Sequence, residues 1–148
     1  MAKTASAGGH GPLKVVDVMT RDPLTLSPAE TIGQADEMMT RNKFRQIPIV
    51  TGKELVGIVT DRDVRSFLSA SLLASPESRE RYLNMPVREI MTTEPITVSP
   101  DDDLQEVVEL LIEEKIGGIP VLDDEEGLVG IVTYVDVLRS FLERLQEE

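Results

Sequence analysis

The sequence contains one long segment twice, and this internal repeat limits the possible folds more than any other feature of the chain. Val18–Pro28 recurs as Ile90–Pro100, and Ile47–Val50 recurs as Ile119–Leu122, both at an offset of 72 residues. Leu55–Thr60 then recurs as Leu128–Thr133 at an offset of 73. The second copy has one extra residue, which lies after Leu122 and before Leu128. At the same place in the first copy, Thr51-Gly52-Lys53 is predicted to form a hairpin turn. Insertions are best tolerated in turns, so the pattern predicts two copies of one structural unit.

Each copy is predicted to have the order β-α-β-β-α. A short extended segment, at residues 24–26 and 96–98, precedes a helix whose apolar residues recur every three or four positions. Two β-rich strands joined by the turn follow, and a closing helix ends the copy. The apolar helix positions are Ile32, Ala35, Met38, Met39, Val64, Phe67 and Leu68 in the first copy, and Leu104, Val107, Val108, Leu111, Val137, Leu138, Phe141, Leu142 and Leu145 in the second.

The size of each copy bears on how the two copies are arranged. The chain has 148 residues, and aromatic residues make up 3% of them, so the core must be aliphatic. A unit of roughly 60–70 residues buries little surface alone, so the copies are expected to share a core. We predict a disordered tail at residues 1–13, the first repeat with its connector at residues 14–83, and the second repeat at residues 84–148.

Composition excludes several classes of protein. The chain has no cysteine, which excludes disulfides and thiolate sites and is consistent with the cytoplasm. No apolar stretch approaches the roughly 20 residues that cross a membrane. Residues 14–83 carry 10 basic and 10 acidic side chains, whereas residues 84–148 carry 4 basic and 17 acidic ones. Neither half offers the basic surface that nucleic-acid binding requires, and a phosphate-bearing ligand is expected to prefer the first half.

The segment from Gly57 to Asp63 combines an apolar strand with an immediate helix start. The first N–H groups of a helix have no partner within the helix and favour anions. A phosphate there would also meet the Thr60 hydroxyl and the Arg62 guanidinium, while Asp63 could accept hydrogen bonds from ribose hydroxyls. The alternative is that Thr60 and Asp61 only cap the helix and that Asp63 faces solvent.

The chain resembles the cystathionine-β-synthase (CBS) domain family over about residues 15–145. The resemblance is carried by the β-α-β-β-α order, the Met-Thr-x-x-Pro openings, the Ile-Pro strands and the two Gly-Ile-Val-Thr-x-x-Asp segments. The tandem is similar to a Bateman module. This implies an α/β (α+β) fold in which two repeats with pseudo-two-fold symmetry pack sheet to sheet.

The resemblance also implies two ligand sites, in which the family uses Thr and Asp for phosphate and ribose and an apolar slot for the base. Site 1 would comprise Leu24, Thr25, Arg45, Ile47, Pro48, Thr60, Arg62 and Asp63. Site 2 would comprise Ile96, Thr97, Gly118, Ile119, Pro120, Thr133 and Asp136. Ile47 and Ile119 could equally be ordinary core residues.

The two sites are not expected to be equivalent. The second copy has Val135 where the first has Arg62, and glycine where the first has Arg45. Site 1 is therefore expected to favour a phosphorylated nucleotide, and site 2 a less anionic adenosine ligand or none. Tyr134 could stack on a base or simply be exposed.

A catalytic role is not expected, because His10 is the only histidine and the repeats occupy nearly the whole chain. No metal site is expected either. The resemblance implies a regulatory module that senses an adenosine-containing ligand (AMP, ADP or ATP first, then NAD or S-adenosylmethionine), forms a homodimer and acts in trans on an effector protein. One alternative is a ligand-free scaffold that dimerises through Phe67, Leu68, Leu72, Leu138, Phe141 and Leu142. Another is a divalent-cation sensor that uses the acidic runs 101–103 and 123–126.

Overall fold

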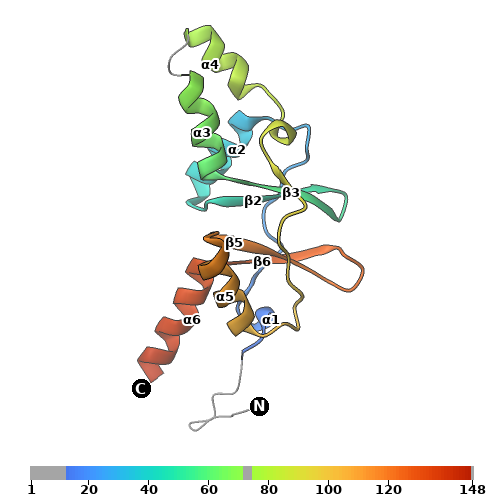
Figure 1. Cartoon of the computed structure of the whole chain (residues 1–148), viewed down its shortest axis with the longest axis vertical. Coiled ribbons are helices and arrows are strands. Elements are labelled where there is room, and N and C mark those ends of the chain that lie inside the picture. Colours follow the sequence, from blue (N-terminus) through green and yellow to red (C-terminus); the bar gives the residue numbers. More distant parts are fainter. Residues whose placement is uncertain (1–12, 72–74, 148) are drawn as a thin grey trace. The chain divides into compact units, whose positions relative to one another are not determined.

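The computed structural model describes residues 13–71 and 75–147, which form two compact units. The first-repeat unit is Pro23–Pro95, and the second-repeat unit combines the described residues on either side of that segment. Each unit has one three-stranded antiparallel sheet together with helices, which confirms the predicted mixed α and β class. Figure 1 shows that the helices of each unit lie on one side of its sheet. Of the predicted disordered tail, residues 1–12 lie outside the described residues.

The first-repeat unit is built on the β2–β3 hairpin, to which β4 adds the third strand. Its elements are α2 (Ile32–Asn42), β2 (Gln46–Thr51), β3 (Glu54–Thr60), α3 (Asp61–Ser71), α4 (Pro76–Leu83), a 3₁₀ helix (Val87–Glu89) and β4 (Thr92–Thr93). Thr31 and Gln34 form a capping box at the start of α2, which buries Ile32, Ala35 and Met39 as the spacing predicts. The predicted strand at residues 24–26 is reduced to one bridge, between Leu26 and Ile49.

The second-repeat unit repeats this plan. Its elements are α1 (Val15–Val18), β1 (Thr20–Arg21), α5 (Leu104–Glu114), β5 (Gly118–Leu122), β6 (Leu128–Thr133) and α6 (Tyr134–Glu147). The sheet order is β1-β6-β5, and the predicted strand at residues 96–98 is again a single bridge, between Val98 and Val121. The core of this unit is aliphatic, as the composition predicts, and consists of Val15, Met19, Val98, Val107, Ile119, Val121 and Val132.

The opening strand of each repeat pairs with the hairpin of the other repeat. Thr20 in β1 lies opposite Ile131 in β6, and Thr92 in β4 lies opposite Ile58 in β3. This exchange explains why the compact units do not follow the order of the repeats along the chain. The strand that leads into each junction, β3 or β6, therefore pairs with the opening strand of the other repeat.

The closing helices of the two units are covered differently. In the first-repeat unit, α4 packs on α3, and the Phe67 and Tyr82 rings meet edge to face with centroids 5.2 Å apart. In the second-repeat unit, α6 leaves Leu138, Phe141, Leu142 and Leu145 each at least half exposed. The two copies thus share a fold but differ in the apolar surface of their last helix.

Candidate functional site

In the first repeat, the candidate site lies where β3 ends at Thr60 and α3 begins at Asp61. The Thr60 N–H donates to Asp63 Oδ2 at 2.9 Å, and the Asp63 N–H donates to Thr60 Oγ1 at 3.1 Å. This reciprocal pair is a capping box, in which both side chains satisfy otherwise unpaired donors at the helix start. The sequence therefore places these two residues together for a structural reason as well as for any role in binding.

The second repeat has the same arrangement at the start of α6. The Thr133 N–H donates to Asp136 Oδ2 at 2.9 Å, and the Asp136 N–H donates to Thr133 Oγ1 at 3.3 Å. The Thr133 hydroxyl also lies 3.2 Å from Asp136 Oδ2. The duplicated sequence motif is thus a duplicated structure.

The prediction that the first N–H groups of each helix are unpaired and free to bind an anion is wrong for most of these groups. The Asp61 N–H donates to the Arg45 carbonyl at 2.9 Å, and the Tyr134 N–H donates to the Gly117 carbonyl at 3.1 Å. The capping boxes supply partners for the N–H groups of Thr60, Asp63, Thr133 and Asp136. Among the described residues at these two helix starts, only the N–H groups of Arg62 and Val135 therefore lack a partner. The Arg45 carbonyl comes from the segment between α2 and β2, and the Gly117 carbonyl from the segment between α5 and β5; the sequence pattern did not indicate either contact.

The two aspartates differ in their surroundings. The Asp136 side chain is only 6% exposed, and its Oδ1 accepts a hydrogen bond from the Thr20 hydroxyl at 3.1 Å. Arg139 Nη1 lies 3.6 Å from the same oxygen. Asp63 is only partly buried, and its Oδ1 has no partner within the described parts of the chain. Asp63 therefore has the more available carboxylate oxygen, whereas Asp136 is already held by its neighbours.

Sequence reasoning missed Thr20 and Arg139. Thr20 belongs to the duplicated Met-Thr-x-x-Pro opening, so the repeat itself marked it, but only the strand exchange brings it to Asp136. Arg139 follows Asp136 by three residues on a helix, a spacing that places two side chains on the same face. That spacing could have identified it as a cation near the second junction, where Val135 replaces Arg62.

Two glycines permit the close approach of the exchanged strands. A Cβ on Gly57 would lie 2.8 Å from the Thr92 carbonyl oxygen, and one on Gly130 would lie 2.9 Å from that of Thr20. Both distances are shorter than any relaxed Cβ contact, so a larger residue would push the strand away. Gly57 thus lets β4 pass close to β3.

The residues predicted to hold a base fall into two groups. Ile47 and Ile119 belong to the unit cores, and Pro48 and Pro120 are buried as well. The Pro48 and Pro120 carbonyls accept hydrogen bonds from the Leu26 and Val98 N–H groups, which tie each hairpin to the extended segment before it.

The other predicted site residues lie nearer the surface. Leu24 and Ile96, which occupy equivalent positions, are 51% and 37% exposed. Thr97, Arg45 and Arg62 are exposed, Thr25 is partly buried, and Gly118 is buried opposite Thr133. No hydrogen bond or ion pair in the described residues joins Leu24 or Thr25 to the Thr60–Asp63 pair.

The acidic runs of the second half have structural partners. Asp103 precedes α5 and forms a 2.7 Å ion pair with Lys14, and this hydrogen bond raises the pKa of the Lys14 ammonium above its ordinary value. Asp123 Oδ1 accepts from the Gly127 N–H at 2.8 Å and so closes the β5–β6 turn. Within the described ranges, no group of three or more His, Cys, Asp or Glu side chains is arranged to hold a metal ion.

No helix of the described chain has the length and apolar character needed to cross a bilayer.

Comparison with known proteins identifies relatives along most of the chain. The chain is 32% identical to the CBS domain-containing protein YhcV of Bacillus subtilis over 123 residues, which are 83% of this chain and 81% of YhcV. Its structure is similar to that of CBSX2 in complex with AMP, with a TM-score of 0.74 and 28% identity over 88% of this chain and 96% of that one. It is also similar to the CBS domain pair of protein MJ0100 in complex with 5′-methylthioadenosine and S-adenosyl-L-methionine, with a TM-score of 0.76 and 28% identity over 90% of this chain and 98% of that one.

Other relatives are considerably longer than this chain. Protein MJ1225 of Methanocaldococcus jannaschii is 33% identical over 132 residues, which are 84% of this chain but 47% of MJ1225. The matches to the inosine-5′-monophosphate dehydrogenases of Korarchaeum cryptofilum and M. jannaschii cover 22% and 23% of those enzymes.

The family profile described as CBS domain matches the chain twice, at residues 15–70 and 87–143. Together with the paired β-α-β-β-α units and the relatives above, these matches show that the chain belongs to the CBS domain family.

Proposed function

We propose that the chain is a non-catalytic regulatory module of the cytoplasm that binds an adenosine-containing small molecule and passes its ligand state to a separate effector protein. The duplicated Thr–Asp pair at the two strand-to-helix junctions is the observation that carries this proposal. The AMP complex of CBSX2 and the 5′-methylthioadenosine and S-adenosylmethionine complex of MJ0100 support the ligand class.

At the first junction, Asp63 would hold the ribose. Its Oδ2 is used by the capping box, which fixes the carboxylate, while Oδ1 can accept hydrogen bonds from the ribose hydroxyls. The Thr60 hydroxyl, the Arg62 N–H and the exposed Arg62 and Arg45 guanidiniums would meet a phosphate. Leu24 is an exposed apolar side chain that could cover a base. This junction therefore favours AMP, ADP or ATP.

At the second junction, Asp136 and Thr133 would take the corresponding roles. The carboxylate is buried and already accepts from Thr20, so a ribose hydroxyl would either add to Oδ1 or displace the Thr20 hydroxyl. Ile96 offers the equivalent exposed apolar surface.

Isothermal titration calorimetry of the full chain with AMP, ADP, ATP, NAD and S-adenosylmethionine tests the proposal. We expect saturable binding of at least one ligand. Asp63→Asn should weaken binding at the first site by about tenfold or more, because hydrogen bonds to a charged carboxylate are lost. Asparagine keeps an acceptor oxygen for the Thr60 N–H, so the helix cap survives. Asp136→Asn makes the same test at the second site.

Asp61→Asn is the matched control for the first site. Asp61 lies on the same helix and carries the same charge, but it pairs with Arg65 at 3.2 Å. Its substitution should leave nucleotide affinity unchanged. Protein that is free of co-purified nucleotide and binds none of the five ligands would contradict the proposal.

A ligand-free scaffold is the second candidate function, and the exposed apolar face of α6 is the observation that favours it. This face consists of Leu138, Phe141, Leu142 and Leu145. We propose that it mediates homodimer formation, whether or not a ligand binds. Dimer formation in the absence of any nucleotide binding would leave the scaffold function alone.

A further inference from the structure

Residues 13–22, here called the strap, belong to the second-repeat unit although they come from the other end of the sequence. The Lys14 ammonium pairs with Asp103 at 2.7 Å, and the Val15 and Met19 side chains are buried in the core of the unit. After α1, the strap continues into β1, which pairs with β6. The second-repeat unit therefore takes part of its core and its third strand from the strap.

The strap brings the Thr20 hydroxyl to the carboxylate of Asp136. Thr20 Oγ1 donates to Asp136 Oδ1 at 3.1 Å, while Oδ2 accepts from the Thr133 N–H at 2.9 Å. Arg139 Nη1 lies 3.6 Å from Oδ1. With these neighbours, Asp136 is only 6% exposed. Little of the carboxylate surface remains open, so a neighbour must move before a ribose hydroxyl can reach it.

Of these neighbours, Thr20 can move at the lowest cost. Thr133 is fixed by its capping box with Asp136, because moving it would leave donors at the start of α6 unpaired. Arg139 is already too far from Oδ1 for a strong hydrogen bond, so it does not occupy that oxygen. Thr20 is exposed and lies in a strand of two residues, so its hydroxyl can turn to water when the strap shifts.

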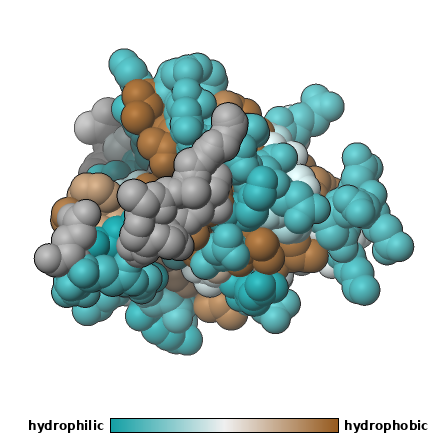
Figure 2. All heavy atoms as spheres, turned by 90° about the horizontal axis from the view of Figure 1, so that it is seen from below, coloured by the Kyte–Doolittle hydropathy of each residue, from teal (hydrophilic) through white to brown (hydrophobic). Residues whose placement is uncertain are grey.

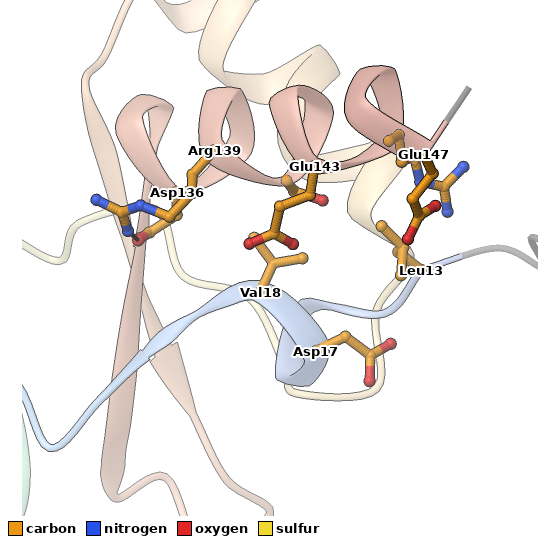
Figure 3. A pocket seen from close by; sticks show the side chains of 9 residues that line it. Leu13, Asp17, Val18, Asp136, Arg139, Glu143 and Glu147 are labelled. Atoms are coloured by element: carbon orange, nitrogen blue, oxygen red, sulfur yellow. Dashed lines mark ion pairs between the residues drawn. The ribbon is translucent and has the colours of Figure 1, made fainter.

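A cavity beside the strap leaves room for such a shift. The cavity has a volume of about 250 Å³ and is lined by α1 on one side and α6 on the other. Figure 3 shows α1, with Asp17 and Val18, across the cavity from Asp136, Arg139 and Glu143 of α6. The strap is therefore not closely packed against α6 at this place, which lowers the cost of moving it.

We propose that the strap is an autoinhibitory element of the second junction, in which Thr20 occupies the carboxylate oxygen that a ribose would use. A ligand must displace the Thr20 hydroxyl, so the ligand and the strap compete for Asp136. This competition is reciprocal, so bound ligand loosens the strap by the same factor by which the strap weakens the ligand. The inference rests on the proposed function and names the regulation of its second site.

The first repeat has the equivalent strand without this contact. Thr92 in β4 lies opposite Ile58, as Thr20 in β1 lies opposite Ile131. No hydrogen bond joins Thr92 to Asp63 within the described parts of the chain, and Asp63 is only partly buried. The autoinhibition is therefore confined to the second junction, and the first junction is open to a ligand without a shift of β4.

Thr20→Val tests the inference, because valine keeps the shape of threonine and suits a strand but has no hydroxyl. Calorimetric titrations with AMP and with 5′-methylthioadenosine use the full chain carrying Asp63→Asn, so that the second site dominates. Thr20→Val should raise affinity at the second site by about tenfold, since binding no longer has to break a hydrogen bond to a charged carboxylate. Thr20→Ser keeps the hydroxyl and should bind as the parent chain does. Thr92→Val, the same change in the first repeat, is the matched control and should leave affinity unchanged.

Hydrogen–deuterium exchange gives a second readout that needs no substitution in the strap. In the chain carrying Asp63→Asn, saturating 5′-methylthioadenosine or AMP should speed exchange in peptides that cover residues 13–22. The equivalent segment of the first repeat, residues 85–94, should exchange at the same rate with and without ligand. A ligand that bound without displacing Thr20 would instead slow exchange in the strap.

Unchanged or weaker binding after Thr20→Val, or slower exchange of the strap with ligand, would overturn the inference while leaving adenosine binding in place. Loss of all binding with Asp63→Asn, even in combination with Thr20→Val, would also overturn it, because the second junction would then bind neither compound. If the wild-type chain binds no adenosine compound, the proposed function itself fails, and the inference fails with it.

Discussion

At each junction, the residues proposed to bind a ligand also cap a helix. Thr60 and Asp63 cap α3, and Thr133 and Asp136 cap α6, with hydrogen bonds of 2.9–3.3 Å. A capping box orients its carboxylate, so one oxygen faces the helix and the other faces away. The cap therefore fixes in advance the direction of the oxygen that a ribose would use.

Gly57 and Gly130 allow the neighbouring strand to reach each junction. Gly57→Ala would place a methyl group 2.8 Å from the Thr92 carbonyl oxygen, which is backbone and cannot rotate away. We expect a loss of about 1–3 kcal/mol in the free energy of unfolding, the usual cost of overpacking. Gly130→Ala should have the same effect through the Thr20 carbonyl. Urea denaturation measures both.

Gly127→Ala is the control for this pair. Its Cβ would come no closer than 3.4 Å to any described atom outside its own neighbours, so the expected change is within about 0.5 kcal/mol. A Gly57→Ala variant as stable as Gly127→Ala would mean that β4 does not cross β3 at this point.

Helices were the elements most directly predictable, because a buried face needs apolar residues every three or four positions. Ile32, Ala35 and Met39 are buried as the spacing of α2 predicts. The first hairpin was predictable from Thr51-Gly52-Lys53, and Gly52 indeed has a positive φ of 64°. The short strands β1 and β4 were not predictable, since two residues carry no periodicity and their pairing depends on the other repeat.

The helices α2 and α5 end in the same way, at Lys43 and Lys115. Both residues are exposed and adopt the left-handed conformation, with φ of 59° and 55°. Glycine adopts this conformation without strain from a Cβ atom. Lys43→Gly and Lys115→Gly should therefore each raise the free energy of unfolding by about 0.5–1 kcal/mol. Thermal or urea denaturation checks the sign.

The control for α5 is Glu113→Gly, two residues before Lys115 and within the helix. There glycine should lower the free energy of unfolding by about 0.5–1 kcal/mol, because it costs backbone entropy without relieving strain. Destabilisation by all three glycine substitutions would contradict the proposed relief at the helix ends.

At the scale of the whole chain, the strand exchange is the main feature that the sequence could not indicate. The repeat offset gives the order of the elements but not which strand joins which hairpin. Val15 and Met19 are buried with Val98, Val107 and Ile119, which come from the far end of the chain. For the same reason, the sequence identified the Thr–Asp pairs, whose members are three residues apart. It did not identify the contact of Thr20 with Asp136, which are separated by 116 residues in the sequence.

The difference between the closing helices predicts how copies of the whole molecule associate. In the first-repeat unit, α4 covers part of α3, whereas α6 has its apolar residues exposed in the second-repeat unit. Figure 2 shows hydrophobic patches among hydrophilic residues on the face seen from below. An exposed apolar face of this kind gains free energy when it is buried against a second copy. We therefore expect the wild-type chain to be a dimer that is held together through α6.

Leu138→Glu and Leu142→Glu should each convert the dimer to a monomer, because a charge would be buried twice, once from each copy. Both side chains are more than half exposed in the single chain, so the substitutions should leave its folding intact. The control is Ile112→Glu, an apolar residue that is 68% exposed on α5, which should leave the dimer unchanged. Sedimentation equilibrium over a range of concentrations measures the state of each protein. A wild-type chain that stays monomeric at the highest concentration, or dissociation by Ile112→Glu as complete as by Leu138→Glu, would exclude α6 as the dimer interface.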